Sequence, residues 1–394
     1  MKTDTDSPSD IPDLQARSVA SIHDVAPKAW DACAGADNPF LHHAFLACLE
    51  DSGSATPETG WAPAHILIES LHGELLACAP SYFKSHSYGE FIFDHGWADA
   101  FERAGGRYYP KLLTAVPFTP ATGPRLLVPP GPDEDALRRT LATTIVRVAE
   151  EAGVSSAHIN FATQAEWELL GKQGFLQRTG VQFHWENDGY KTFDDFLVSL
   201  SSRKRKAIKK ERREATGNDI EIIPLTGDDL TSDAWDAFYA FYRDTGSRKW
   251  GTPYLTREFF DLLGERLGER VLLIMCRREG RWIAGALNLI GHDTLYGRYW
   301  GCVEDHRFLH FECCYYQAID YAIEHGLARV EAGAQGSHKI QRGYLPVLTY
   351  SAHWIEHGGL RDAVARFLKE EGQHVDWEVD AIQRDYSPFR KENG

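Results

Sequence analysis

Hydrophobic and polar residues follow two patterns along this chain, one with helical spacing and one typical of short strands. In residues 133–153, Leu137, Leu141 and Ile145 recur at helical spacing, which predicts one long helix. The same pattern predicts helices at residues 164–173, 194–215, 234–242, 257–267, 308–325, 337–343 and 360–371. Short apolar or aromatic runs predict strands at residues 64–69, 74–83, 156–161, 177–185, 271–277, 282–290, 294–303, 328–331 and 349–355. A mixed α/β protein is therefore expected.

The order of these elements repeats once. The junction EEAGVSSAHINF recurs as IEHGLARVEAG, and GVQFHW recurs as TYSAHW, both at offsets of about 170 residues. Two agreeing offsets are what a duplicated unit predicts, although helix–strand alternation is common enough to produce the same pattern by chance. We divide the chain into a disordered lead at 1–18, a first domain at 19–190, a second domain at 191–358, and a C-terminal helix and tail at 359–394.

Composition narrows the class of protein. The chain has 394 residues, of which 43% are hydrophobic, and its formal net charge is -15, which disfavours general adhesion to nucleic acid or anionic membrane. Its seven cysteines show no CxxC or Cys/His cluster, so we expect reduced thiols and no metal site. The polar N-terminus lacks a signal sequence, and no apolar run reaches the roughly 18 residues of a membrane span. A cytoplasmic protein is expected.

The segment EAGAQGSHKIQRGYLP, at residues 331–346, carries the most chemistry. A predicted strand ends at Glu331, and a glycine-rich loop then delivers His338, Lys339 and Arg342. A carboxylate, an imidazole and two cations can transfer a proton and hold an anion. The alternative is that the glycines only turn the chain and that the cations lie on a solvated helical face.

A basic block opens the predicted second domain. Eight of the eleven residues from 203 to 213 are Lys or Arg, a strong local departure in an acidic chain. Like charges on adjacent helical turns repel, so a phosphate-rich partner is one interpretation, and a solvated or internally paired face is the other. The absence of interleaved aromatic residues favours contact with a backbone or diphosphate over base recognition. The candidate phosphate or tRNA contacts are Arg203, Arg205, Lys206, Lys209 and Arg212.

Further polar residues are candidates for lining a substrate pocket. In the second half they cluster at residues 298–316, where the alternative for the tyrosine is ordinary core packing, and in the first half they lie in loops rich in Pro and Gly. They are Arg298, Trp300, His310, Glu312 and Tyr315, together with Lys111 and Arg125. The chain has no GxSxG, P-loop, HExxH or dinucleotide-binding GxGxxG motif, which argues against hydrolase, kinase, metalloprotease and dehydrogenase functions.

Several long motifs resemble the FemAB-like peptidoglycan biosynthesis/recognition family of the GNAT acyltransferase superfamily. They are GRYWG, HFECCYYQAIDYAI and VEAGAQGSHKIQRGYLP in the second half, and DHGWADAFERAGGRYYPKLL, AVPFTPATGPRLL and VQFHWEN in the first. The resemblance covers about residues 40–355. It implies two tandem GNAT-like domains, each with a mixed, mostly antiparallel central sheet flanked by helices, and an N-acyltransferase activity.

One departure from the superfamily bears on the donor. Acetyl-CoA-dependent enzymes of this superfamily share a glycine-rich loop, which binds the pyrophosphate of the cofactor through backbone amides. Here VEDHRFLHFECCYY has no glycine, and the equivalent place in the first half has Pro130 and Pro132 beside Gly131. We therefore expect no bound cofactor and an aminoacyl-tRNA donor, as in Fem-type enzymes.

These observations lead to an aminoacyl- or acyltransferase acting on an amine, such as that of a peptidoglycan precursor. Glu331 or His338 would take the proton, while Lys339 and Arg342 would face anionic charge. Two alternatives stay open, an acyl-CoA-dependent N-acyltransferase and a non-catalytic binding module for cell-wall precursor or nucleic acid. The sequence does not define the oligomeric state.

Overall fold

The computed structural model describes residues 14–217, 219–249, 253–333 and 336–390. Its strands are β1 (Leu14–Val19), β2 (Trp61–Pro63), β3 (His65–Ser70), β4 (Leu75–Ala79), β5 (Ser81–Lys84), β6 (Lys111–Thr114), β7 (Ser156–Ala162), β8 (Leu176–Glu186), β9 (Ile220–Leu225), β10 (Val271–Arg278), β11 (Arg281–Ile290), β12 (Thr294–Cys302), β13 (Arg329–Glu331) and β14 (Leu345–Ile355). Most of these strands lie where the sequence predicts them.

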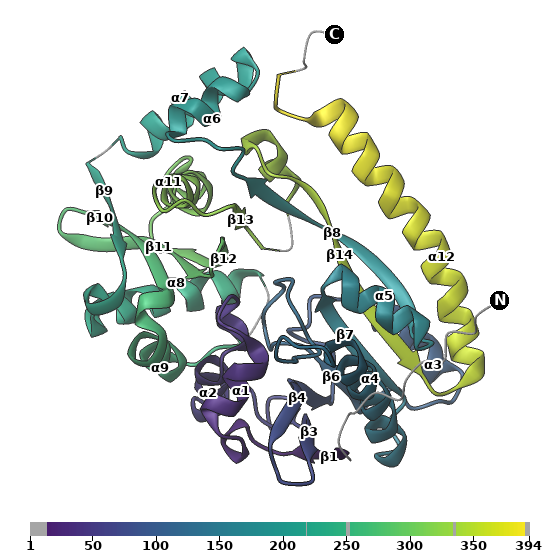
Figure 1. The fold of residues 1–394 in the computed structure, drawn as a ribbon. Helices are drawn as coiled ribbons and strands as arrows, with labels where there is room; N and C mark the ends of the chain where they lie inside the picture. Colours follow the sequence, from purple (N-terminus) through teal and green to yellow (C-terminus); the bar gives the residue numbers. More distant parts are fainter. Residues whose placement is uncertain (1–13, 218, 250–252, 334–335, 391–394) are drawn as a thin grey trace.

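The helices are α1 (Pro27–Ala34), α2 (His43–Asp51), α3 (His95–Arg103), α4 (Glu134–Glu151), α5 (Gln164–Lys172), α6 (Phe193–Ser199), α7 (Ser202–Ala215), α8 (Ser232–Lys249), α9 (Arg257–Leu267), α10 (Leu309–Phe311), α11 (Gln317–Glu324) and α12 (Gly358–Ala381). The segment Glu312–Tyr316 between α10 and α11 is a π-helix, and η6 (Ser337–Arg342) is a 3₁₀ helix. Figure 1 shows α12 lying along the curved strands β8 and β14, far from α8 and α9.

An eleven-stranded sheet runs through both halves of the chain in the order β2-β5-β6-β7-β14-β8-β13-β12-β11-β10-β9, and β1-β3-β4 form a small second sheet. Among the described strands, only β6 with β7 and β12 with β13 pair in parallel. In each half, a helix connects the two parallel strands, as a parallel connection requires. The sheet is therefore mixed and mostly antiparallel, as predicted.

The two halves exchange their last strands. β8, from the first half, pairs with β13 of the second, while β14, from the second half, pairs with β7 of the first. β8 and β14 also pair with each other, from Leu345–His184 to His353–Leu176. These are the strands that carry the repeated motifs GVQFHW and TYSAHW. The boundary predicted near residue 190 thus lies in a region where the sheet is continuous across both halves.

Three large apolar cores support this sheet. One joins α1 and α2 of the first half to α8 and α9 of the second, one packs beneath the π-helix and α11, and one packs α4 against β3 and β7. The first core is contributed by both halves, so the halves are bound by apolar packing as well as by the exchanged strands.

Several predicted boundaries are corrected by the structure. The lead predicted as disordered to residue 18 is ordered from Leu14, where β1 pairs antiparallel with β3 and thereby satisfies the backbone groups on that side of β3. Residues 1–13, and Ala334 and Gln335 in the predicted glycine-rich loop, lie outside the described residues. The last helix runs to Ala381 rather than residue 371, and α1, α2 and α3 were not predicted.

Candidate functional site

The parallel strands β12 and β13 part at the place where the sequence puts its main cluster. They pair only through Thr294–Tyr296 and Arg329–Glu331, after which β12 continues to Cys302 whereas β13 ends. At Gly297 a Cβ atom would lie 3.3 Å from the backbone oxygen of Glu331, so a side chain would crowd the point of separation. In α/β folds, ligands commonly bind where the carboxyl ends of neighbouring parallel strands diverge.

Glu331 lies buried at this point, with only 6% of its surface exposed. Its Oε2 accepts no hydrogen bond within the described residues and lies 3.9 Å from Nε2 of His184, which is equally buried on the neighbouring strand β8. Burial raises the pKa of Glu331 to about 8, although the charges of Arg329 and Arg298 act in the opposite direction. A carboxyl group of this kind can exchange a proton near neutral pH.

Residues from the first half contact strand β12 beside Glu331. Tyr296, which is in register with Glu331, packs edge-on against Phe40 with ring centroids 5.1 Å apart. Arg298 donates to the backbone oxygen of Phe118, and Tyr299 donates to the same oxygen at 3.3 Å. The candidate site is thus built at the contact between the two halves.

His338 lies in different surroundings from Glu331. Its Nε2 is 2.8 Å from the hydroxyl of Tyr315, and its ring lies within 6.1 Å of the ring of His310. Tyr315 belongs to the same apolar core as Val330, whereas successive residues of a strand point to opposite faces. Glu331 therefore points away from the core that holds Tyr315, and the structure separates the two predicted proton acceptors onto different faces.

Around His338 the side chains form an aromatic cluster at the molecular surface. The ring of His310 packs against Trp300 at 5.3 Å, and the guanidinium of Arg342 lies 3.5 Å over the ring of Phe311. Trp300, His310 and Phe311 are half-buried, and His338 is exposed. The structure thus brings together four of the predicted site residues, Trp300, His310, Tyr315 and His338.

Lys339 connects the loop to the end of β13. Its buried Nζ donates to the backbone oxygen of Gly333 at 2.8 Å, and burial lowers its pKa to about 8. The charge of Lys339 also lowers the pKa of His184. Lys339 therefore lies close enough to the Glu331–His184 pair to influence it electrostatically.

Helix α7 carries the basic block and divides it into two faces. On the inner face, Arg212 pairs with the buried carboxylate of Glu312 at 2.9 Å and with Asp320 at 2.5 Å. Arg342 pairs with Glu211 at 2.9 Å and also donates to the backbone oxygen of His338 at 2.8 Å. These contacts anchor α7 to the π-helix, to α11 and to η6.

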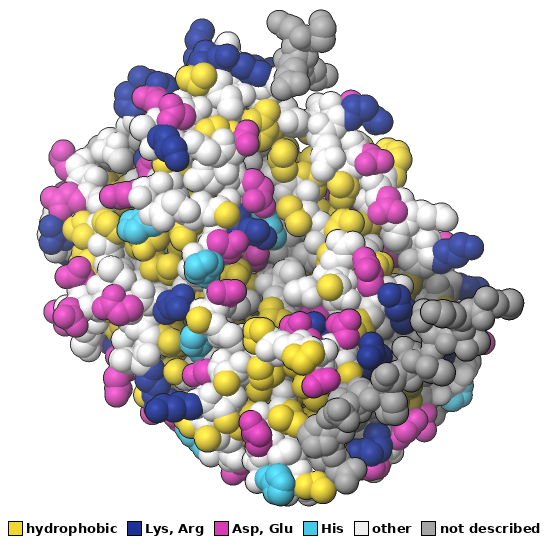
Figure 2. All heavy atoms as spheres, viewed as in Figure 1, with side chains coloured by type: hydrophobic (Ala, Val, Ile, Leu, Met, Phe, Trp, Pro, Cys, Tyr) yellow, Lys and Arg dark blue, Asp and Glu magenta, His cyan; other side chains and the backbone are white. Residues whose placement is uncertain are grey.

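The outer face of α7 keeps its cations available. Within the described residues, Arg203, Arg205, Lys206 and Arg213 form no ion pair, and Lys209 has only the exposed partner Asp194 at 2.9 Å. Figure 2 shows Lys and Arg side chains gathered over α7, at the top of the molecule. The basic block is therefore partly internally paired and partly solvated.

Two predicted site residues, Arg212 on α7 and Glu312 on the π-helix, need a different interpretation. Glu312 and Arg212 neutralise each other, and Gln317 donates to Glu312 at 2.8 Å. Burial raises the pKa of Glu312 above its ordinary value, and Arg212 opposes this rise. The sequence predicts Glu312 as a pocket-lining carboxylate and Arg212 as a phosphate contact, but their geometry favours a structural ion pair.

Lys111 likewise forms a buried structural cluster. Its Nζ donates to Glu90 at 2.8 Å, to Ser87 at 2.8 Å and to Asp94. Burial alone would lower the pKa of Lys111, but the two carboxylates raise it above its ordinary value. This geometry favours a structural role over the predicted substrate contact, because the ammonium group is fully enclosed by its own partners.

Arg125 is also enclosed, in the Pro- and Gly-rich loop of the first half. Its guanidinium donates to the backbone oxygens of Asn160 at 2.9 Å and Ala121 at 2.7 Å. Burial lowers the pKa of Arg125 to about 10, and the charges of Glu166, Tyr296 and Glu331 act against this lowering. Arg125 therefore shapes the loop and the local field rather than offering a free guanidinium.

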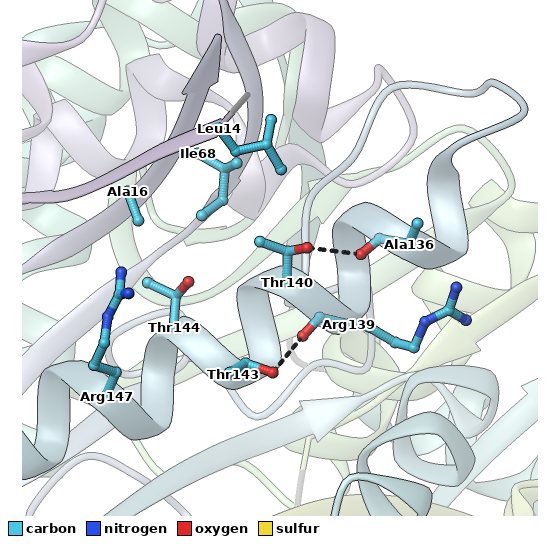
Figure 3. A pocket seen from close by; sticks show the side chains of 9 residues that line it. All are labelled: Leu14, Ala16, Ile68, Ala136, Arg139, Thr140, Thr143, Thr144 and Arg147. Carbon is cyan, nitrogen blue, oxygen red and sulfur yellow. Dashed lines mark hydrogen bonds between the residues drawn. The ribbon is translucent and has the colours of Figure 1, made fainter. Parts of the chain in front are cut away.

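The protein also has a surface groove and a small internal cavity. A groove of about 500 Å³ runs between β1, β3 and α4, and Figure 3 shows Thr140 and Thr143 donating their hydroxyls back to the helix backbone. A smaller apolar cavity, with room for about 10 Å³, borders Arg298 and Tyr299 between the halves. The larger groove is lined by none of the candidate site residues, so its size does not identify it as the active site.

Residues that sequence reasoning missed include His184 and Gln182 on β8. His184 was visible only as part of the repeated HW motif, and nothing in the sequence shows that β8 lies beside β13. No group of three or more metal-ligating side chains occurs in the described ranges. Nor does any helix among those residues have the length and apolarity to span a bilayer.

Comparisons with known proteins place this geometry in context. The sequence pattern of the FemAB-like family, described as peptidoglycan biosynthesis/recognition, matches residues 21–391. A search of curated proteins found no match. Similar solved structures include FemX, with 13% identity and a TM-score of 0.54, where the match covers 89% of this chain and 100% of FemX.

Two further structures share the fold. The C-terminal domain of an Agrobacterium fabrum protein, provisionally named a lysylphosphatidylglycerol synthetase, matches with 10% identity and a TM-score of 0.54 over 90% of this chain and 97% of the domain. L-PGS from Bacillus licheniformis matches with 8% identity and a TM-score of 0.50 over 85% and 98%. The predicted fold class, two tandem GNAT-like units with mixed, mostly antiparallel sheets, is confirmed.

Proposed function

The chain belongs to the FemAB-like family, and on this premise we propose that it transfers an aminoacyl group from aminoacyl-tRNA to an amine acceptor such as a peptidoglycan precursor. The family description and the shared fold support a peptidoglycan-related transferase of the acyltransferase type. The observation that carries the proposal is the buried carboxyl group of Glu331 at the point where β12 and β13 part.

The proposed reaction needs one proton acceptor. The acceptor amine attacks the ester carbonyl of the donor, a C–N bond forms, and the C–O bond to the ribose oxygen breaks. The ionised carboxylate of Glu331 takes the proton that the amine loses and returns it to the departing ribose oxygen, so that the carboxylate is regenerated. A pKa near 8 suits this role, because the group can both accept and release a proton close to neutral pH.

Cations on the outer face of α7 fit a polyanionic donor. The outer face of α7 offers Arg203, Arg205, Lys206 and Arg213 for phosphate groups, and α7 is anchored through Glu211 to the loop that carries His338 and Lys339. A phosphate backbone bound along α7 would therefore end beside the aromatic cluster at His338. Nucleobases stack readily on such aromatic side chains.

The start of α10 supports a tRNA donor over acyl-CoA. Phe308, just before this helix, adopts a left-handed φ of 65°, and the amide of Leu309, the first of the helix, already donates to the backbone oxygen of His306. Pyrophosphate binding needs free amides at a regular helix start. This start is instead followed at once by the π-helix.

A binding module without chemistry is the second candidate, because Glu331 is closed to solvent while Arg203, Lys206 and Arg213 on α7 are exposed. A transfer assay separates the candidates. Purified full-length protein is incubated with a UDP-linked cell-wall peptide and either a mixture of charged tRNAs or acetyl-CoA, and products are measured by mass spectrometry. We expect a mass gain only with charged tRNA. A gain only with acetyl-CoA would reverse the assignment of the donor, and salt-sensitive tRNA binding without product would favour the binding module.

A further inference from the structure

Gln182 has a fixed orientation next to the candidate site. Its buried side chain donates through Nε2 to the backbone oxygen of Pro120 at 2.8 Å, and a carbonyl oxygen can only accept. The amide nitrogen must therefore face Pro120, which turns the amide oxygen toward the opposite side. That oxygen lies 3.4 Å from Nε2 of His184.

This orientation determines the tautomer of His184. Because the Oε1 atom of Gln182 is an acceptor, the Nε2 atom of His184 must carry the hydrogen. The same Nε2 lies 3.9 Å from Oε2 of Glu331, the oxygen that has no partner in the described part of the chain. Burial lowers the pKa of His184 to about 3, helped by the charges of Arg329 and Lys339, so the imidazole is neutral.

We propose that His184 is a positioning residue whose Nε2 hydrogen, donated to Oε1 of Gln182 while Glu331 is protonated, turns to the carboxylate of Glu331 once that group ionises, and that Gln182 selects the tautomer this requires. At 3.9 Å the contact is too long for a hydrogen bond, and it closes when Glu331 loses its proton. His184 thereby stabilises the form of Glu331 that accepts a proton. The consequence for catalysis rests on the proposed function, whereas the hydrogen bond itself does not.

The symmetry of the exchanged strands gives independent support. His353 occupies on β14 the place that His184 occupies on β8, and it faces His158 on β7 as His184 faces Glu331 on β13. The Nδ1 atoms of His353 and His158 lie 2.7 Å apart, within hydrogen-bond distance. The repeated HW motif thus places a histidine against the parallel strand of the other half in both cases.

Other charges also act on Glu331 and bound the expected effect. Arg329 on β13 and Arg298 on β12 lower its pKa, whereas Glu186 on β8 and Asp293, before β12, raise it. Arg125, in the loop of the first half, also interacts with Glu331 through its charge. Removing the hydrogen bond from His184 therefore changes one contribution among several, and the expected shift is moderate.

The test measures the pKa of Glu331 directly. The carboxyl stretching band of Glu331 is followed by infrared spectroscopy against pH and identified by its loss in Glu331→Gln. In His184→Phe, which keeps an aromatic ring without a donor, the pKa of Glu331 is expected to rise by about 1. Gln182→Leu is expected to raise it less, and the matched control His353→Phe is expected to leave it unchanged.

An unchanged or lowered pKa of Glu331 in folded His184→Phe, checked by circular dichroism, would overturn the proposal. If His184→Phe does not fold, Gln182→Leu decides, because an unchanged pKa of Glu331 in that variant also contradicts the fixed tautomer. Where transfer is measurable, the pH–rate profile of His184→Phe should move to higher pH. Absence of transfer in every variant with the expected infrared shift would reject the proposed function and leave the role of His184 intact.

Discussion

His158 and His353 face each other across the exchanged strands β7 and β14, with their Nδ1 atoms 2.7 Å apart. Both side chains are buried. Only one of the two nitrogens can carry the shared hydrogen, so at least one ring must be neutral. Burial lowers the pKa of His158 to about 3 and that of His353 well below its ordinary value, so both are neutral at physiological pH.

This pair predicts a loss of stability in mild acid. Unfolded histidines bind protons below about pH 6.5, whereas the folded pair resists protonation, so unfolding takes up protons and the free energy of unfolding falls as pH decreases. The fall should begin near pH 6.5 and continue toward pH 3. Denaturant unfolding at several pH values measures it. His158→Phe combined with His353→Leu should flatten this slope, and an unchanged slope would contradict the neutral pair.

Lys111→Met should destabilise the fold rather than affect substrate binding selectively. Removing the ammonium group leaves the buried carboxylates of Glu90 and Asp94 without their cation. Breaking a buried ion pair in this way costs about 3–5 kcal/mol. Urea unfolding of Lys111→Met against the wild type checks the cost. Near wild-type stability with weakened acceptor binding would instead restore the predicted substrate contact.

The sequence predicted most of the fold because its patterns were local. The helix at 133–153 and the hairpin at 271–290 depend on spacing within one segment, and both are found at nearly the predicted positions. The strand exchange depends on which distant segments pair, and no local pattern encodes this. The motif GVQFHW suggested duplication, but it did not show that His184 lies beside Glu331. Only the pairing of β8 with β13 shows this.

The candidate site was predicted in part for the same reason. His338, Lys339 and Arg342 were identified as one cluster from their closeness in sequence. The last two residues of β13, however, point to opposite faces of the sheet. Glu331 therefore faces the first half, while Tyr315 and His338 lie on the other side. The sequence also does not show which charged side chains pair in the folded protein. Arg212 was therefore predicted to contact phosphate, whereas in the structure it pairs with Glu312.

The outer face of α7 should bind polyanions in a salt-dependent manner. Replacing Arg203 and Lys206 with Ala removes two exposed cations, which should reduce the slope of log affinity against log salt by about 1.4 to 1.8. Fluorescence titration with labelled tRNA at several salt concentrations measures this slope. Arg366→Ala combined with Lys369→Ala, which removes the same charge from the exposed face of α12, is the matched control. Equal slopes in both variants would remove α7 from the binding surface.

Glu331→Gln should stabilise the protein at alkaline pH. The folded-state pKa of about 8 is above the unfolded value, so between pH 4.5 and 8 unfolding releases a proton and the free energy of unfolding falls as pH rises. The amide has no proton to release and avoids this fall. Thermal unfolding at pH 5 and pH 8.5 should therefore show a smaller loss for Glu331→Gln than for the wild type. Equal losses would mean that Glu331 is not the buried acid described here.

The central claim is that Glu331 moves a proton during acyl transfer, and one comparison tests it most directly. Transfer rates of the wild type and Glu331→Gln are measured with charged tRNA and a UDP-linked cell-wall peptide across pH 6–10, after both proteins are shown to be folded. We predict a wild-type rate that rises with pH to a plateau above about pH 8, and a rate at least about tenfold lower and without this rise in Glu331→Gln. Equal rates with the same pH dependence would contradict the account.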